Sequence, residues 1–289
     1  TDTTIVVQQT ASAVGNHPAE MNPTNVPPDS QVTDVAELPP PPYVKILWLY
    51  WDKGMEDLSQ QKGKYAADYY CVQAWKKINP TWDVRVLDSA EAQKLAPNYA
   101  VLTKDTTGRV NAVKASNVLR LELLSRYGGV WSDTSICPFR PLDEFLPGML
   151  ADIGYFSPSL ENEAGKLGRS ELAQFAECHK WTAAEIESGE EPQHGEARST
   201  ENFFVAAATP HHILIDAWFE ALFDRMVIIM DEEVTKCDKP YRCFPYYIAQ
   251  CTFTQVRLRN AEVDALWTKF ALKNFWSYGD EGGMCFGGS

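Results

Sequence analysis

A helical run that ends at two adjacent glycines is the strongest structural signal in the sequence. Apolar residues recur at helical spacing through residues 112–127, and Gly128 and Gly129 follow at once. Glycine tolerates the positive φ that a helix end commonly requires, so the helix should stop there. The apolar run 130–132 then reads as a buried strand. This order places Asp133 at the carboxyl end of that strand.

The segments before and after this run complete an alternating α/β pattern. Residues 44–51 and 83–87 are short apolar runs typical of strands, and the periodic segment 64–79 between them indicates a helix that Pro80 ends. A further strand is expected over 203–207 and a helix over 210–230. Strands that alternate with helices form a mostly parallel sheet flanked by helices. Ligands of such sheets bind beyond the carboxyl ends of the strands, which is where Asp133 lies.

The chain divides by composition near residue 42. Residues 1–42 are rich in Pro, Thr, Ser and Asn and end in four consecutive prolines, a composition that favours an extended arm over a packed domain. We expect this arm to be a stem or a docking segment through which subunits could associate. Residues 43–289 are expected to form a single catalytic domain.

Charge and cysteine usage narrow the class of protein. The net charge of −13 and pI of 4.9 disfavour nucleic acid as a partner, because such a surface repels a phosphate backbone. No apolar run reaches the roughly 18–20 residues needed to cross a bilayer. Seven scattered cysteines form no CxxC pair, which favours a reducing, cytoplasmic setting. The alternative is the lumen of the secretory pathway, if an N-terminal anchor has been trimmed.

Two polar residues of the expected helix share one face. Asn117 and Arg120 are three positions apart and border its apolar stripe, so Arg120 should be partly buried and should need an anionic partner. Asp133 or a bound diphosphate could supply that anion. Spacing alone leaves two interpretations open, namely a ligand-binding pair and a structural Arg–Asp pair that ties the helix to the strand.

The segment 115–135 closely resembles the DXD-motif sugar transferases, in particular the capsular-polysaccharide-synthesis branch. Those proteins typically read Ser-Asp-x-x-Arg, then Leu-Leu, Tyr-Gly-Gly, an aromatic residue, and Asp-x-Asp or Asp-x-Thr. The likeness extends over roughly 43–215. It is carried there by Trp48–Gly54, Ala74-Trp75, Asn79-Pro80, Arg140-Pro141-Leu142, Glu201–Ala207 and Pro210-His211.

The resemblance implies a GT-A fold and a nucleotide-sugar donor, here a UDP-linked sugar. It also implies a divalent cofactor, Mn²⁺ or Mg²⁺, that neutralises the diphosphate leaving group. By position in the motif, Asp133 would contact the donor ribose and the metal, and Arg120 would steady the donor or the Asp133 carboxylate. The stretch Leu49, Tyr50 and Trp51 would hold the nucleotide base, and Asn117 would accept a hydrogen bond from a sugar hydroxyl.

Two residues depart from the family pattern. Ser135 stands where the main metal-binding aspartate is expected, and Asn117 stands where the family usually has Asp. The predicted metal ligands are therefore Asp133 and Ser135, with Asp280 completing the shell from the C-terminal tail. Because a hydroxyl is a weaker ligand than a carboxylate, metal binding should be weak or depend on Asp280.

The remaining catalytic candidates are Glu201 and Asn202, at the start of an expected strand. An inverting enzyme needs a carboxylate base near the acceptor hydroxyl, and a retaining one needs a polar group beneath the anomeric centre. Either role suits this pair, and so does a plain strand-end cap.

The function predicted from these residues is a hexosyl- or pentosyltransferase that moves a sugar from the donor to a hydroxyl of a glycan. Two alternatives keep the donor site, namely a degenerate binding module without turnover and a transferase that modifies protein side chains. A glycoside hydrolase that pairs Asp133 with Glu201 is a further class, but it leaves Arg120 without a role.

Overall fold

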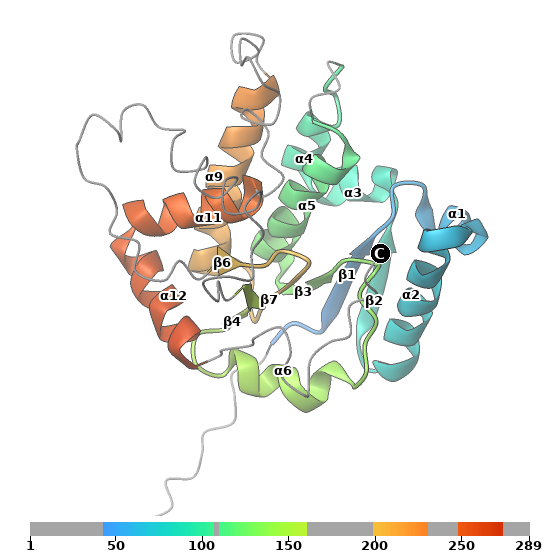
Figure 1. Ribbon diagram of the computed structural model, residues 1–289, viewed down its shortest axis with the longest axis horizontal. Helices are drawn as coiled ribbons and strands as arrows, with labels where there is room; N and C mark the ends of the chain where they lie inside the picture. The colour runs from blue at the N-terminus through green and yellow to red at the C-terminus, as the bar shows by residue number, and fades with distance from the viewer. Residues whose placement is uncertain (1–42, 107–109, 161–198, 231–247, 274–289) are drawn as a thin grey trace, which may run out of the picture. The chain divides into compact units, whose positions relative to one another are not determined.

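The computed structural model describes residues 43–106, 110–160, 199–230 and 248–273 (Figure 1). The predicted N-terminal arm, residues 1–42, lies outside these ranges, as does Asp280. The arm and its role in association therefore stay predictions.

A five-stranded mixed sheet forms the centre of the described body, in the order β2-β1-β3-β7-β4. The strands are β1 (Ile46–Tyr50), β2 (Asp83–Leu87), β3 (Gly129–Ser132), β4 (Tyr155–Phe156) and β7 (Phe204–Ala207). β1 is parallel to β2 and β3, whereas β7 is antiparallel to both β3 and β4. The predicted α/β class with a mostly parallel sheet flanked by helices is confirmed, and β7 is the one strand of this sheet that runs the other way.

Helix α5 (Ala112–Tyr127) has the predicted bounds. The side chain of Asn111 accepts the backbone N–H of Lys114 and caps its start. At its end, Gly128 and Gly129 have φ of +67° and +91°. A Cβ on Gly129 would lie 2.5 Å from the carbonyl oxygen of Ile46 on β1. Both a positive φ and a close approach of two backbones therefore require glycine at position 129.

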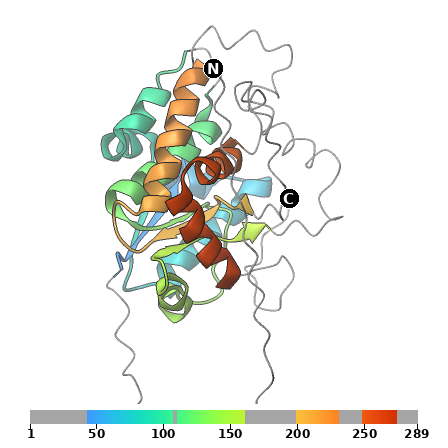
Figure 2. The ribbon, with the colours of Figure 1, turned by 90° about the vertical axis from the view of Figure 1, so that its left-hand side faces the viewer.

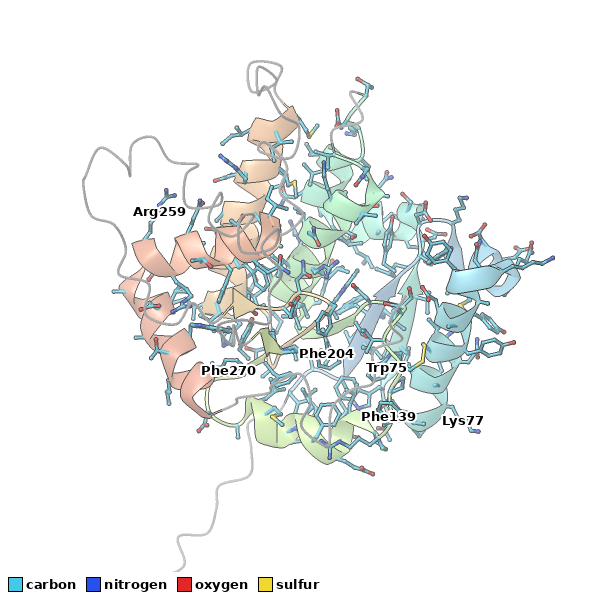
Figure 3. The ribbon with its side chains drawn as sticks, viewed as in Figure 1. Trp75, Lys77, Phe139, Phe204, Arg259 and Phe270 are labelled. Atoms are coloured by element: carbon cyan, nitrogen blue, oxygen red, sulfur yellow. A yellow bond between two sulfur atoms is a disulfide. The ribbon has the colours of Figure 1, made fainter. Side chains whose placement is uncertain are left out.

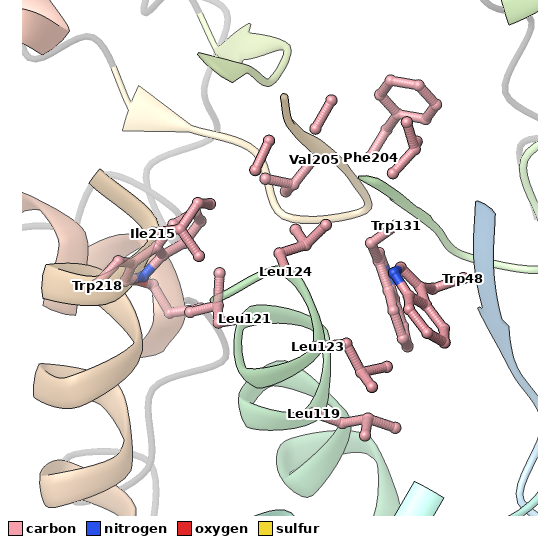
Figure 4. Packing of buried hydrophobic residues seen from close by; sticks show 14 of the residues in the cluster. Trp48, Leu119, Leu121, Leu123, Leu124, Trp131, Phe204, Val205, Ile215 and Trp218 are labelled. Carbon is pink, nitrogen blue, oxygen red and sulfur yellow. The ribbon is translucent and has the colours of Figure 1, made fainter. Parts of the chain in front are cut away.

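Helices α2 (Ala66–Ile78) and α5 cover opposite faces of the sheet. Trp48 and Trp131 are register partners on neighbouring strands, and their rings lie on the side of α5 (Figure 4). Phe204 points to the other face, where it stacks on Trp75 of α2 with ring centroids 6.2 Å apart (Figure 3). Alternation along the strands thus divides the apolar residues between the two helices.

A group of C-terminal helices extends the core beyond α5. These are α9 (Ile213–Met230), α11 (Ile248–Arg259) and α12 (Ala261–Lys273). α9 packs against α5 and against both later helices, which lie beside it in Figure 2. Trp218 of α9 contacts Phe253 of α11 with ring centroids 4.9 Å apart, and its indole N–H donates to the Ala249 carbonyl.

The remaining described elements are short. They are α1 (Gly54–Gln60), the 3₁₀ turn η1 (Gly63–Tyr65), α3 (Ser89–Leu95), α4 (Pro97–Leu102), α6 (Leu142–Leu150), β5 (Ser159–Leu160) and β6 (Ser199–Thr200). β5 and β6 pair with each other as a separate two-stranded sheet. β6 ends directly before Glu201, so the pairing of β5 with β6 fixes the position of the Glu201 backbone.

A disulfide joins Cys71 of α2 to Cys137, in the loop that follows β3. The scattered cysteine spacing gave no sign of this pair. Disulfides persist chiefly in oxidising compartments, whereas the cysteine spacing predicted a reducing setting. Among the helices that the structure describes, none is long and apolar enough to cross a membrane.

Candidate active site

The centre of the site is an ion pair between Arg120 and Asp133. Arg120 Nη1 lies 3.4 Å from Asp133 Oδ1, and the two side chains are 6% and 36% exposed. The helix spacing predicted that Arg120 would be partly buried beside an anion, and this placement is confirmed. Asp133 follows β3 directly, so the pair lies at the carboxyl end of a central strand.

Further contacts fix the direction of both side chains. The guanidinium of Arg120 lies 5.1 Å from the centre of the Trp131 ring, and Trp131 Nε1 donates to Asp133 Oδ1 at 2.9 Å. Arg120 Nη1 also donates to the backbone carbonyl of Asn202, and Arg120 Nε to the carbonyl of Ser116 at 3.3 Å. The pair is therefore held in one orientation by α5, by β3 and by the segment before β7.

Asn117 and Asn202 meet directly. Asn202 Nδ2 donates to Asn117 Oδ1 at 3.0 Å, and both side chains are half-buried. They join the turn of α5 that carries Arg120 to the segment before β7. The two asparagines selected from the sequence thus belong to one cluster with the Arg120–Asp133 pair.

Glu201 is a buried carboxyl beside this cluster. It is 7% exposed, and Gln250 Nε2 of α11 donates to its Oε2 at 3.3 Å. Burial raises the pKa of Glu201 to about 7, while hydrogen bonds from Gln250 and the backbone of Asn202 act in the opposite direction. The charge of Arg120 also lowers this pKa and that of Asp133 raises it, so all three groups share one electrostatic environment. A carboxyl that titrates near neutrality can give or take a proton under physiological conditions.

Asp68 of α2 is a second carboxyl close to Asp133, and it was not among the residues selected from the sequence. It is 8% exposed and accepts a hydrogen bond from Thr134 Oγ1 at 3.1 Å. Burial raises its pKa, the hydrogen bond from Thr134 lowers it, and the negative charge of Asp133 raises it further. The sequence does contain a pattern that indicates burial of Asp68. This residue lies four positions before Val72 and seven before Trp75, which places it on the apolar face of the helix.

The three residues predicted to hold the nucleotide base, at the end of β1, differ in burial. Leu49 is fully buried in the core, and its place in the predicted base-binding stretch stays a prediction. Tyr50 and Trp51 are half-buried. Tyr50 and Tyr99 share a hydrogen bond between their hydroxyls at 2.7 Å, and Trp51 Nε1 donates to Asp57 at 2.8 Å. These two aromatic residues are the part of the predicted base-binding stretch that reaches the surface.

The predicted metal ligands are only partly assembled. Asp133 is half-buried and Ser135 is exposed, whereas Asp280 lies outside the described residues. Within the described ranges, no group of three or more His, Cys, Asp or Glu side chains could hold a metal ion. Asp133 Oδ1 already contacts Arg120 and Trp131. One carboxylate beside a guanidinium, with one hydroxyl, does not by itself fit a tightly bound Mn²⁺ or Mg²⁺.

The other residue that sequence reasoning missed is Gln250. It belongs to α11, far along the chain from Glu201, and an isolated glutamine in a helix carries no pattern that would indicate a site.

Comparisons with known proteins give a family match and one curated relative. Residues 33–225 match the family described as capsular polysaccharide synthesis protein. The glycosyltransferase afumC of Aspergillus fumigatus is 33% identical in an alignment of 118 positions that covers 37% of this chain. The chain spans only 28% of the length of that relative.

Two solved structures are also similar in fold. The PaToxG glycosyltransferase is 11% identical with a TM-score of 0.42, covering 81% of this chain and 77% of that one. The catalytic domain of the alpha-toxin from Clostridium novyi is 10% identical with a TM-score of 0.31, covering 80% of this chain and 67% of that one. These likenesses are too distant to extend any activity to this chain.

Proposed function

We propose that this chain, which belongs to the capsular polysaccharide synthesis protein family, is a glycosyltransferase. Its donor would be a nucleotide sugar, specifically a UDP-linked hexose or pentose. Its acceptor would be a hydroxyl of a glycan. The 33% identity to a glycosyltransferase supports the reaction class, and the residues around Asp133 support the donor class.

The observation that carries the proposal is the Arg120–Asp133 pair at the carboxyl end of β3. A guanidinium buried to 5% exposure is costly without anionic partners, and its planar fork suits the two oxygens of a phosphate group. Asp133 is 36% exposed, which leaves part of its carboxylate accessible to a ligand. We therefore assign Arg120 to the diphosphate and Asp133 to the donor ribose.

The neighbouring residues suit the other parts of the donor. Tyr50 and Trp51, at the end of β1, offer aromatic surface for the base. Asn117 is half-buried beside Asn202, and an amide of this kind can bind a sugar hydroxyl without adding charge. The base, the diphosphate and the sugar would then follow one another from β1 towards β7.

In the proposed reaction, the bond between the anomeric carbon and the diphosphate breaks, and its electron pair leaves with the diphosphate. The acceptor oxygen bonds to that carbon and its proton passes to Glu201, whose pKa near 7 suits a proton acceptor. Arg120 stabilises the charge that develops on the leaving group. Asn202, whose backbone carbonyl accepts from Arg120, keeps that guanidinium in place.

No step of this reaction is assigned to a metal, because the two predicted ligands that the structure describes, Asp133 and Ser135, supply one carboxylate and one hydroxyl. If Mn²⁺ or Mg²⁺ takes part, Asp133 and Ser135 are its proposed ligands, together with Asp280 from the C-terminal tail.

The test is a panel of nucleotide sugars offered to the full chain with and without Mn²⁺. Release of free nucleoside diphosphate is the readout. At least one UDP-sugar should be turned over, and an acceptor glycan should raise the rate. If no donor in the panel is bound or hydrolysed under either condition, the proposed function is wrong.

A degenerate binding module is the second candidate, and two observations favour it. Ser135 replaces the expected carboxylate, and Asn117 already accepts a hydrogen bond from Asn202. This candidate predicts donor binding without product release, even with Mn²⁺ and acceptor present. A transferase that modifies protein side chains predicts turnover of the same donor with a protein as acceptor.

The disulfide between Cys71 and Cys137 supports action in an oxidising compartment such as the secretory lumen. Mass spectrometry of the protein isolated under alkylating conditions tests this. Free thiols at both positions would favour the cytoplasmic alternative.

A further inference from the structure

One face of helix α2 holds the loop that carries Asp133. Its contacts are the hydrogen bond from Thr134 Oγ1 to Asp68, the disulfide from Cys71 to Cys137, and the hydrogen bond from Trp75 Nε1 to the Ile136 carbonyl at 2.8 Å. The three helix residues are three and four positions apart, which is the spacing of neighbours on one helix face. The loop is thus attached to α2 along its length.

The first of these contacts lies inside the turn that begins at Asp133. The Ile136 N–H donates to the Asp133 carbonyl at 3.0 Å and closes a turn that contains Thr134 and Ser135. The Asp133 N–H donates to the Phe203 carbonyl at 2.8 Å, which fixes the start of the turn to the segment before β7. The Thr134 side chain is therefore the contact of α2 that lies between Asp133 and Ser135 in this turn.

Asp68 is an unusual choice for a purely structural tie. Burying a carboxyl is unfavourable, and a second carboxyl near it adds like-charge repulsion to that cost. At 8% exposure, Asp68 nevertheless accepts the hydroxyl of the residue that follows Asp133, so its contact falls on the turn that carries the candidate ligand residues.

We propose that Asp68 is a positioning residue for the donor site: by accepting the Thr134 hydroxyl it orients the turn from which Asp133 and Ser135 reach the ligand. This inference rests on the proposed function. Its rival is that Asp68 merely ties α2 to the loop, in which case its loss would lower stability and leave donor binding unchanged.

The test compares Asp68→Ala, Thr134→Val and the double variant in the full chain. We measure the affinity for UDP by calorimetry, kcat and KM for the donor that the wild type uses, and Tm. Each single variant should lower kcat/KM by about 100-fold, the loss typical of a reacting group displaced by about 1 Å. Both remove the same hydrogen bond, so the double variant should lose no more than the worse single variant.

Conservative rescue separates positioning from packing. Asp68→Asn keeps an oxygen that can accept from Thr134, and it should recover most of the lost kcat/KM. If Asp68→Ala does not fold, Thr134→Val and Asp68→Asn carry the comparison. A loss in Asp68→Asn as large as in Thr134→Val would show that the hydrogen bond is not the means of positioning, and would overturn the proposal.

A matched control removes a buried carboxylate elsewhere. Glu122 is fully buried and accepts hydrogen bonds from the backbone of Asn98 and Tyr99 at the start of α4. Glu122→Gln should lower Tm and leave the affinity for UDP within about twofold of wild type. Asp68→Ala should instead lower that affinity clearly.

The Asp133→Asn background supplies the sharpest readout. If Asp68 acts through Asp133, then Asp68→Ala should cause no further loss of UDP affinity once Asp133 is replaced. An unchanged affinity and kcat/KM in Asp68→Ala, beside an active wild type, would overturn this inference alone. A wild type that neither binds UDP nor turns over any donor would overturn the proposed function as well, so the two failures are distinguishable.

Discussion

Replacing Arg120 with methionine separates a structural ion pair from a donor-binding one. The variant keeps the length of the side chain but loses its charge, the ion pair with Asp133 and the hydrogen bond to the Asn202 carbonyl. Breaking a fully buried pair costs about 3–5 kcal/mol. The Asp133 side chain is 36% exposed, however, and water replaces part of that interaction. We therefore expect a loss of about 2 kcal/mol in the free energy of unfolding, which lowers Tm by about 4–8 °C in a body of this size.

The expected effect on the donor is larger than the effect on stability. A charge-assisted contact to a diphosphate contributes about 2–3 kcal/mol, so the affinity for UDP should fall by about 30- to 150-fold. Arg120→Lys keeps the charge without the planar fork and should lie between wild type and Arg120→Met. Circular dichroism gives Tm and calorimetry gives the affinity. A normal affinity for UDP in Arg120→Met, with the fall in Tm as expected, would refute the donor role and leave the pair as a structural tie.

Three further predictions concern single features of the body. Burial raises the pKa of Glu201 from 4.5 to about 7, so the folded protein keeps a proton that the unfolded chain releases between these values. The free energy of unfolding should fall by on the order of 3 kcal/mol as the pH rises through that window. In urea titrations, Glu201→Gln should show a smaller dependence of this free energy on pH. An equal dependence in both proteins would contradict the raised pKa of Glu201. Gly129→Ala should lower the free energy of unfolding by about 3 kcal/mol or more, because the new Cβ would lie 2.5 Å from the Ile46 carbonyl oxygen and φ is +91°. A variant with the Tm of the wild type would be incompatible with this backbone geometry. Removing the disulfide with Cys71→Ser and Cys137→Ser should lower the free energy of unfolding by about 4 kcal/mol, given a sequence separation of 66, whereas no change would indicate free thiols in the wild type.

Local sequence patterns were sufficient to predict the helix–turn–strand unit at the centre of the fold. The periodic run that becomes α5, the two glycines after it and the short apolar run of β3 lie next to one another in the chain, and together they place Asp133. The pairing of Arg120 with Asp133 could also be predicted from the sequence, because a helix and the strand that follows it pack together after a tight turn. Their roles in donor binding stay predictions.

Features that depend on segments far apart in the chain could not be predicted from the sequence. The antiparallel direction of β7 is set by a crossover through residues far from β3, and no local pattern records it. Gln250 meets Glu201 only because α11 packs against β6, which directly precedes Glu201. Leu49 was assigned to the site by its place at the end of a strand, but the alternation along β1 turns its side chain into the core.

Turnover of a UDP-sugar by wild type and by Asp133→Asn, each verified as folded by circular dichroism, tests most directly whether Asp133 is the centre of the site. Asp133 would hold the donor ribose, and the charge of its carboxylate is what asparagine lacks. The wild type should release nucleoside diphosphate and Asp133→Asn none above background, with little change in Tm. Release at a near-normal rate by the folded Asp133→Asn variant would contradict the claim that Asp133 is the centre of the site.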